Sequence, residues 1–420
     1  MKKRLLPLLA LLLLVLAVAP ARAQQVTAIK AGKLIDPETG ATAVNQVILV
    51  EGRKIKAVGA GLQIPAGAQV IDLSNSTVLP GLFDAHTHLC MTTRKQRDNG
   101  NYYFTTLLDP TGYRAIQGVA NARAMLESGF TTVRDIGNAG NYADTDLRRA
   151  IEEGLVPGPT VINAGRIIAP YGGQFYLQPE KRDLANPEYF FADTRDEIKK
   201  GIRENIHYGA TVIKLVVDDQ RYIYSTDDIR FAVEEAGRAG LKVATHCWTE
   251  QGARNAAAAG VASIEHGFRM SDEALELAKK NNVVLVGTDF TEEAAIQMGV
   301  PDPKGFHNVW VDRLRRAYKI GVTMAYGTDV IYAQEGQTRG TLSITFIDSF
   351  VEAGVPAKAI VKIMTTNAAR LLGVDKTRGA IRPGQAADII ATPENPFDNI
   401  QTLKRVSFVM KDGQVFKQGK

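Results

Sequence analysis

Apolar residues are spaced differently at the two ends of the chain and in its middle. Residues 26–78 hold short apolar or β-branched runs, such as residues 47–50, which are separated by turn residues. Runs of this length between turn residues predict β-strands. The same pattern returns near the C-terminus. We therefore expect a small β-sandwich that residues 24–80 and 384–420 form together.

Residues 81–383 show short apolar runs that alternate with longer segments of helical spacing. The predicted strands are residues 82–88, 131–135, 161–166, 212–217, 243–247, 263–266, 283–288 and 322–327. Eight strand–helix units over this length predict a (β/α)₈ TIM barrel, so the fold class is α/β. A doubly wound sheet fits less well, because no glycine-rich phosphate loop follows the first predicted strand.

Residues 1–23 have the pattern of a cleavable signal peptide. Basic residues at positions 2–4 precede an apolar run over residues 5–19, and Ala21-Arg22-Ala23 follows. This order is typical of secretory signals, so we expect the protein to be exported and to be periplasmic or secreted. The apolar run is shorter than the about 20 residues that span a bilayer. We expect no membrane association after cleavage.

Charge gives no indication of a nucleic-acid partner. The chain has 50 basic and 45 acidic residues, and four of the basic residues lie in the predicted signal peptide. The remaining chain is therefore close to neutral. Nucleic-acid-binding proteins commonly carry a basic patch or stripe, and no basic run with interleaved aromatic residues follows in the sequence.

The chain contains two cysteines, Cys90 and Cys247, which are too few for a disulfide framework. Cys90 has the same strand parity as His86 and His88, whereas Cys247 has the opposite parity to His246. Side chains that alternate in this way point to different sides of a barrel wall, too far apart to be bridged. We expect two free, buried thiols.

His86 and His88 are candidate metal ligands. They lie two residues apart at the carboxyl end of the first predicted barrel strand, and residues two apart in a strand point to the same face. Both imidazoles can therefore reach one metal ion. Active sites of TIM barrels lie at the carboxyl ends of the strands, so the placement agrees with the spacing.

Four further side chains of ligand type lie at the carboxyl ends of other predicted strands: Lys214, His246, His266 and Asp329. Each of them alone has a structural explanation, since an aspartate after a strand is often a helix cap and a lysine stem packs well in apolar surroundings. Six such residues on one rim of a barrel are better explained by a shared metal site.

The sequence around these residues resembles the metal-dependent amidohydrolase superfamily. The resemblance extends over essentially the whole chain after the signal peptide, and the branch that it resembles most holds imidazolonepropionase-like enzymes, prolidase-like dipeptidases and ochratoxin-hydrolysing amidases. The segments that carry it are Asp84-Ala85-His86-Thr87-His88, Lys214, His246, Ile264-Glu265-His266-Gly267, Gly327-Thr328-Asp329, and residues 80–84, 366–369 and 384–388.

The resemblance implies a centre of two divalent metal ions. His86, His88 and Asp329 would hold one ion, His246 and His266 the other, and a carboxylated Lys214 would bridge the two. Nitrogen and oxygen ligands of this kind suit zinc, and they also suit manganese or cobalt. The ions would activate a shared water, and Asp329 would take up its proton and pass it to the leaving amine.

The activity that the resemblance implies is hydrolysis of an amide or peptide bond in a small-molecule amide or dipeptide, or in an N-acyl amino acid. A cyclic amide hydrolase of the imidazolonepropionase type or a deaminase is the alternative, although deaminases typically lack the bridging lysine. A non-catalytic relative is a third possibility, but such relatives usually lose ligands. Members of the branch often assemble into rings, so we expect a homo-oligomer.

Two residues are candidates for substrate contact. Many family members have Gly-Gly-His after the third barrel strand, where this chain has Gly172-Gly173-Gln174. The change to Gln174 implies a different contact at this loop. Tyr224 resembles a tyrosine that meets the substrate carboxylate in the dipeptidase-like members. A packing role at the start of a helix explains Tyr224 equally well.

Overall fold

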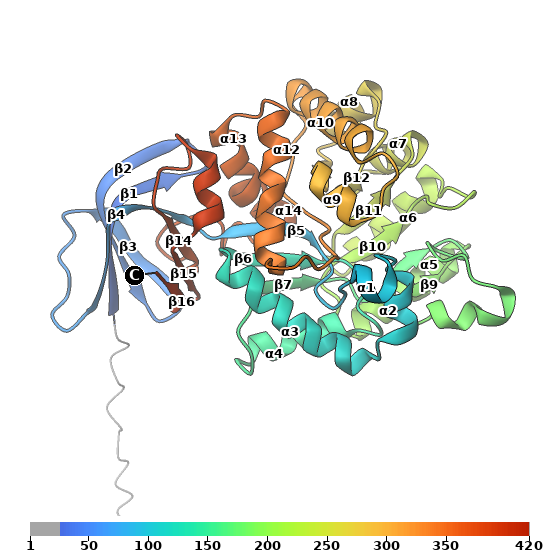
Figure 1. Cartoon of the computed structure of the whole chain (residues 1–420), viewed down its shortest axis with the longest axis horizontal. Coiled ribbons are helices and arrows are strands. Elements are labelled where there is room, and N and C mark those ends of the chain that lie inside the picture. The colour runs from blue at the N-terminus through green and yellow to red at the C-terminus, as the bar shows by residue number, and fades with distance from the viewer. Residues whose placement is uncertain (1–25, 420) are drawn as a thin grey trace, which may run out of the picture.

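The structure is a computed structural model that describes residues 26–419 (Figure 1). The predicted signal peptide, residues 1–23, lies outside the described residues. Within residues 26–419, no helix combines the length and the apolar character that crossing a membrane requires.

Strands from both ends of the chain form one seven-stranded sheet, in the order β16-β15-β14-β4-β1-β2-β3. Strand β14 runs antiparallel to β4, which joins the two ends. A shared β unit was expected from the sequence, whereas its two-layered arrangement stays a prediction. The strands are β1 Val26–Asp36, β2 Ala41–Glu51, β3 Lys54–Ala60, β4 Gln69–Pro80, β14 Ile389–Thr392, β15 Phe408–Lys411 and β16 Gln414–Gln418.

The turn between β15 and β16 shows how the local sequence builds this sheet. Asp412 and Gly413 both have positive φ angles, 48° and 76°. Two-residue hairpin turns of this hand match the right-handed twist of the flanking strands, and Asp-Gly is among the sequences that favour them. The buried face of the sheet is filled by aliphatic residues such as Ile29, Ile48 and Ile389.

The rest of the chain is a mixed α/β fold with two sheets of parallel strands. One has the order β13-β12-β11-β10-β8-β9 and the other β5-β6-β7. Their strands are β5 Leu82–Thr87, β6 Phe130–Asp135, β7 Thr160–Asn163, β8 Ile167–Ala169, β9 Tyr189–Phe191, β10 Ile213–Val216, β11 Val243–Cys247, β12 Ser263–His266 and β13 Val284–Val286.

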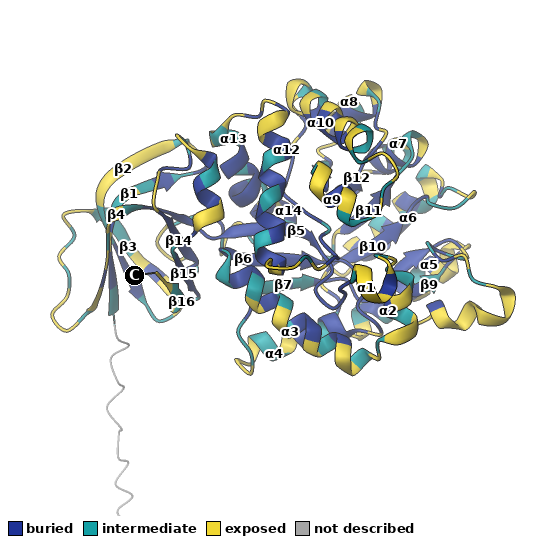
Figure 2. Cartoon of the chain, in the orientation of Figure 1, coloured by how far each residue is buried: buried dark blue, intermediate teal, exposed yellow. Residues whose placement is uncertain are grey.

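The longer helices lie outside these parallel strands, with one face exposed, whereas the strands are mostly buried (Figure 2). The helices are α1 Lys95–Asp98, α2 Tyr103–Leu108, α3 Thr111–Glu127, α4 Ala143–Glu152, α5 Arg195–His207, α6 Thr226–Gly237, α7 Glu250–Ala259, α8 Asp272–Lys280, α9 Glu292–Gln297, α10 Pro303–Ile320, α11 Arg339–Ser343, α12 Ile347–Glu352, α13 Ala357–Lys362 and α14 Ala368–Leu372. Three 3-10 helices cover Pro179–Ala185, Ile344–Phe346 and Ile400–Arg405, and a π-helical segment covers Ile363–Asn367.

Side-chain caps begin the helices that follow the central strands. Ser225, Thr249 and Ser271 each accept a hydrogen bond from a backbone N–H in the first turn of α6, α7 and α8. Such caps satisfy amide groups that a helix start leaves without partners. These three capping residues therefore define where α6, α7 and α8 begin.

The segment 322–327, predicted as the eighth strand, forms no regular strand in the described chain. It has one β-bridge, between Met324 and Leu285 of β13, and the Tyr326 carbonyl accepts a hydrogen bond from the Ala85 amide of β5. The pairing with β13 is confined to Leu285, whose amide donates to the Thr323 carbonyl and whose carbonyl accepts from the Ala325 amide. Directly after the segment, the Thr328 amide donates to the Asp84 carboxylate, so backbone pairing does not continue there.

Cys90 and Cys247 are both buried and free, which confirms the prediction of two thiols. A disulfide between them was unexpected on geometric grounds.

A partly buried ion cluster ties the loop before β14 to the hairpin β15–β16. Arg378 contacts the carboxylates of Asp388 and Asp412, and its distance to the Asp412 oxygen is 2.9 Å. Arg53 approaches Asp412 to 2.6 Å. Burial alone would raise the pKa of Asp412, but Lys411 and Arg378 hold the pKa of this carboxyl below its usual value. The side chain of Arg378 is 14% exposed, so solvent screens the cluster only in part.

We predict that Arg378→Met lowers the free energy of unfolding by about 3 kcal/mol at neutral pH, because it removes the cation that pairs with the buried Asp388 and leaves Asp412 with only Arg53 and Lys411. The native pKa of Asp412 is depressed, so the lost stabilisation belongs to pH values above its unfolded pKa of about 4 and shrinks below that. Urea denaturation at neutral pH and at a pH below the unfolded pKa of Asp412 measures the difference in free energy of unfolding between the variant and the wild type. Arg382→Met is the control, since Arg382 is 55% exposed and lies 3.4 Å from Asp36. Equal losses for both variants would contradict the prediction.

Candidate metal centre

A cavity of about 210 Å³ lies at the carboxyl ends of the parallel strands. It brings together all six ligand-type residues that the sequence singles out, together with Gln174. Its lining consists of His86, His88, Met91, Tyr102, Asn138, Ile167, Gln174, Lys214, Asp219, His246, Trp248, His266, Phe290, Met298, Asp329 and Ile331. A larger cavity of about 800 Å³ lies near the opposite strand ends, and no histidine or carboxylate is among the described residues that line it.

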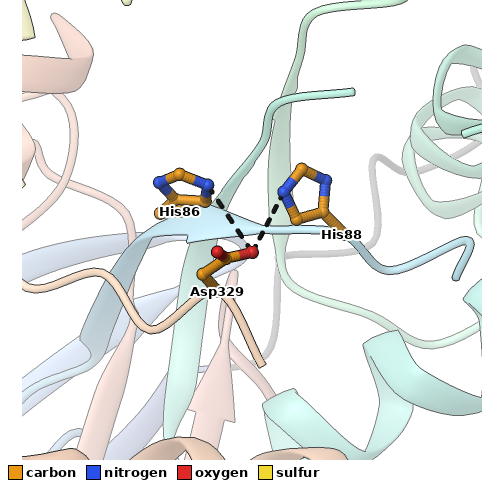
Figure 3. A group of neighbouring side chains, drawn as sticks. All are labelled: His86, His88 and Asp329. Carbon is orange, nitrogen blue, oxygen red and sulfur yellow. Dashed lines mark ion pairs between the residues drawn. The ribbon is translucent and has the colours of Figure 1, made fainter. Parts of the chain in front are cut away.

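His86, His88 and Asp329 form the first group of candidate ligands (Figure 3). The Oδ1 atom of Asp329 lies 3.2 Å from His88 Nε2 and 3.7 Å from His86 Nε2. The Asp329 amide donates to the His86 carbonyl over 2.8 Å, which fixes the aspartate next to β5. Asp329 has φ 55°, an uncommon backbone conformation that turns its carboxylate toward the two rings.

Three of the four histidines of this region, His86, His88 and His266, are oriented through their Nδ1 atoms. His86 Nδ1 lies 2.9 Å from Glu265 Oε2, His88 Nδ1 lies 2.7 Å from the Gly137 carbonyl, and His266 Nδ1 lies 2.9 Å from Thr288 Oγ1. Nδ1 must donate to the carboxylate and to the carbonyl, so in the neutral ring Nε2 of His86 and of His88 is the nitrogen that keeps a lone pair. Partners of this kind are typical of metal-ligating histidines, whose ring and tautomer they fix.

The second group lies beside the first. The ring centroids of His246 and His266 are 4.5 Å apart, and those of His86 and His266 are 4.9 Å apart. His246 Nε2 also lies 3.1 Å from Asp219 Oδ2. Asp219 was not among the predicted site residues, although its position two residues after the predicted strand 212–217 is a signal that could have found it.

Lys214 is 2% exposed and comes from the middle of β10. Burial lowers the pKa of its ammonium group to about 8, with Arg134 adding to the shift and Glu265 opposing it. At neutral pH a measurable fraction of this side chain is therefore an uncharged amine, which is the nucleophilic form.

Two buried carboxylates behind the cavity were also missed as site residues. Glu265 contacts His86 and Arg134, and although burial raises its pKa, Arg134 and His86 hold the pKa at about 2. Burial raises the pKa of Asp84 to about 7, and Asp84 accepts a hydrogen bond from the Thr328 hydroxyl over 2.7 Å. Strand alternation puts Glu265 and His266 on opposite faces, but His266 has φ 64°, which ends that alternation.

The donor set fits divalent cations. Burial lowers the pKa of His86 to about 4 and also holds the pKa of His266 well below its usual value, so both imidazoles are neutral and hold lone pairs. His246 Nε2 is buried and has no hydrogen-bond partner within residues 26–419. A buried polar atom without a partner is costly, and a metal ion at this position would satisfy it. Imidazole nitrogen and carboxylate oxygen are ligands that zinc and similar ions accept.

The two candidates for substrate contact lie in different places. Gln174 lines the cavity, where its Nε2 donates to Asp219 Oδ2 over 2.7 Å and its Oε1 accepts from the Tyr189 hydroxyl over 2.7 Å. Tyr224 is 2% exposed, packs in the core and donates its hydroxyl to the Ala192 carbonyl. The structure therefore brings Gln174 to the cavity and gives Tyr224 a packing position outside the cavity lining.

Known proteins resemble the chain over most of its length. Ochratoxinase from Aspergillus niger is 29% identical, over 96% of this chain and 89% of that protein. The crystal structure of a Xaa-Pro dipeptidase with bound methionine in the active site is 29% identical and superimposes with a TM-score of 0.82, over 94% of this chain and all of the other. The crystal structure of A. niger ochratoxinase gives a TM-score of 0.80 at 25% identity, over 94% of this chain and 96% of the other.

A more distant relative is an imidazolonepropionase from Fusobacterium nucleatum, 23% identical over 82% of this chain and 84% of that protein. Residues 77–416 match the model of the amidohydrolase family. This match covers well over half of the chain and includes every candidate ligand described above. The chain therefore belongs to the amidohydrolase family and is a hydrolase that acts on carbon–nitrogen bonds.

Proposed function

We propose that the protein is a binuclear-metal amidohydrolase that cleaves an amide or peptide bond of a small substrate with an apolar side chain. The observation that carries this proposal is the convergence of His86, His88, Asp329, His246, His266 and Lys214 on one cavity. The similarity to ochratoxinase and to a Xaa-Pro dipeptidase supports hydrolysis of amide bonds over other reactions of carbon–nitrogen bonds.

The two parallel sheets belong, in this proposal, to a single (β/α)₈ barrel over residues 81–383. Hydrogen bonds that link the two sheets support it. Thr211 and Val212, just before β10, donate to the Asn163 carbonyl of β7. On the other side the segment 322–327 connects β5 to β13, because the Ala85 amide donates to the Tyr326 carbonyl and the Leu285 amide donates to the Thr323 carbonyl. The segments before and after, residues 24–80 and 384–420, make the terminal sheet.

His86, His88 and Asp329 would hold one ion, and His246 and His266 the other, with a carboxylated Lys214 between them. Divalent ions in such a centre lower the pKa of a water molecule and polarise the scissile carbonyl. Lys214 can acquire its carboxylate because its uncharged amine bonds to the carbon of carbon dioxide and releases one proton. The product carries a negative charge, which replaces a buried cation by an anion between two cations.

Asp329 is the general base and acid of the proposed reaction. Although burial raises its pKa, His86 and His88 hold the pKa below its usual value, so the carboxylate is ionised at neutral pH. It takes a proton from water as the water oxygen bonds to the carbonyl carbon, and gives that proton to the amine nitrogen when the carbon–nitrogen bond breaks. The products are a carboxylate and an amine.

The cavity wall indicates the substrate class. Apolar side chains dominate the part of the lining that holds no candidate ligand: Met91, Tyr102, Ile167, Trp248, Phe290, Met298 and Ile331. A hydrophobic or aromatic substituent next to the scissile amide would fill this space. Dipeptides with a hydrophobic residue and N-acyl derivatives of phenylalanine have this shape. A cyclic amide is the second candidate, since the relative from F. nucleatum is an imidazolonepropionase.

We predict that metal-loaded enzyme releases amine from hydrophobic dipeptides and N-acyl phenylalanine, and that chelation abolishes this activity. Asp329→Asn should lower kcat by about 1000-fold, because it removes the group that carries the proton. Amino-acid release across a panel that includes a cyclic amide measures both effects.

Asp312→Asn is the matched control, because it removes the same charge from an exposed position in α10. Its kcat should stay unchanged. An Asp329→Asn variant as active as this control would contradict the proposed role, and a metal-loaded wild type inactive on every amide would contradict the proposed function.

We further predict that Lys214→Ala loses activity and that a short carboxylic acid, such as propionate, restores part of it by taking the place of the carboxylated side chain. Intact-mass measurement of the native wild type should show the added carbon dioxide, which acid removes. Full metal content and full activity of Lys214→Ala without added carboxylate would contradict a bridging role.

Export through residues 1–23 and assembly into a homo-oligomer stay predictions. The first concerns residues outside the described part of the chain. Secretion of a full-length fusion and the solution mass of the purified protein test them.

A further inference from the structure

Asp218 and Asp219 follow β10 and bring two carboxylates to the cavity rim beside His246. One oxygen from each and one nitrogen of the histidine lie within 4.8 Å of one another, a spacing at which side chains can share a cation. Neither aspartate has a role in the proposed metal centre as the sequence predicts it. The contacts of the two aspartates distinguish them.

Asp218 is fully engaged by the protein. It is 1% exposed, its Oδ1 accepts from the Trp248 amide over 2.7 Å, and its Oδ2 accepts from the amide and hydroxyl of Thr249 over 2.8 and 2.6 Å. These bonds fix the chain between β11 and α7. Asp218 is therefore a structural residue, which leaves Asp219 as the carboxylate that is available to a ligand.

Asp219 is placed as a metal ligand would be. Its side chain is 28% exposed, and its Oδ2 lies 3.1 Å from His246 Nε2. That separation equals, within 0.1 Å, the 3.2 Å between Asp329 Oδ1 and His88 Nε2 in the first group. Two ligands that hold one ion at about 2.1 Å in tetrahedral geometry lie roughly 3.4 Å apart, so both pairs have the spacing of atoms that share an ion.

His246 provides an independent observation. Its ring is 6% exposed, and among the described residues its Nε2 atom makes no hydrogen bond although a carboxylate oxygen lies 3.1 Å away. A buried ring nitrogen seldom stays without a partner. A cation between this nitrogen and Asp219 would satisfy both atoms.

We infer that Asp219 is a further ligand of the ion that His246 and His266 would hold, and that Gln174 positions it. This inference rests on the proposed binuclear centre. The amide of Gln174 bridges Asp219 and the Tyr189 hydroxyl, so the residue that replaces the histidine of related sequences acts on the metal centre rather than on the substrate. An added carboxylate also gives this ion an anionic ligand of its own, as Asp329 does for the first.

The backbone at Asp219 decides which variants are informative. Its φ of 97° lies in the region that glycine adopts freely and that asparagine tolerates better than most residues. Asp219→Asn removes the charge, and Asp219→Gly removes the whole side chain, in both cases without strong backbone strain. Alanine would add such strain and is less suitable.

Zinc and cobalt(II) binding to the full chain tests the inference. Titration by calorimetry, metal content after dialysis, and the visible spectrum of the cobalt form each report the two ions separately from activity. Wild type should bind two ions. Both Asp219 variants should bind one of them on the order of 100-fold more weakly and the other unchanged, and Gln174→Leu should weaken the same ion by about 10-fold.

Asp228→Asn is the control, because Asp228 is 25% exposed and lies in α6, away from the cavity lining. Its metal affinities should equal those of the wild type. The inference would be overturned if both Asp219 variants bound the metal ions as tightly as the wild type does. It would also be overturned if these variants changed only the KM for substrates with an amino group. A wild type that binds fewer than two ions would instead overturn the proposed function.

Discussion

The site depends on one buried carboxylate, that of Glu265. Glu265 lies on β12 and is fully buried. It contacts Arg134 of β6 and the ring of His86 of β5. A charge at this depth is tolerated only when it is paired and hydrogen-bonded. Arg134 completes the pairing, since it also donates to the Ala85 carbonyl and to the Ser263 hydroxyl. Three strands are thereby held in one arrangement by a single ionic network.

The same network prepares the ligands. Because Glu265 accepts from His86 Nδ1, the opposite ring nitrogen keeps its lone pair and faces Asp329. Burial, to which Arg134 adds, lowers the pKa of the Lys214 ammonium group to about 8, although Glu265 opposes the shift.

Much of the architecture could be predicted from the sequence. The amidohydrolase family was recognised from the spacing of His86 and His88 together with the segments near Lys214, His266 and Asp329, and the family model confirms it. The parallel strands were found because their apolar runs are short and end in polar residues. The strand predicted at residues 322–327 was wrong as a regular element, since its pairing is limited to one bridge with Leu285 and the residue that follows, Thr328, donates to the Asp84 side chain.

Residues whose role depends on contacts distant in the chain could not be found in this way. Glu265 was recognised only as part of a motif, because nothing in its neighbourhood shows that Arg134 lies beside it. Asp219 and Gln174 are 45 positions apart, and only the folded chain brings them together. The sequence alone allows Tyr224 to be a substrate contact or a packing residue. In the structure its buried hydroxyl donates to the Ala192 carbonyl.

The position of β4 has a consequence for how the molecule is made. This strand lies between β1 and β14 and continues almost directly into β5, the strand that carries His86 and His88. Its partner β14 is synthesised roughly 300 residues later, and contacts of such long range form slowly. The strand that carries His86 and His88 therefore gains its full support from the terminal sheet only after residues 389–392 have been made, near the end of the synthesis of each chain.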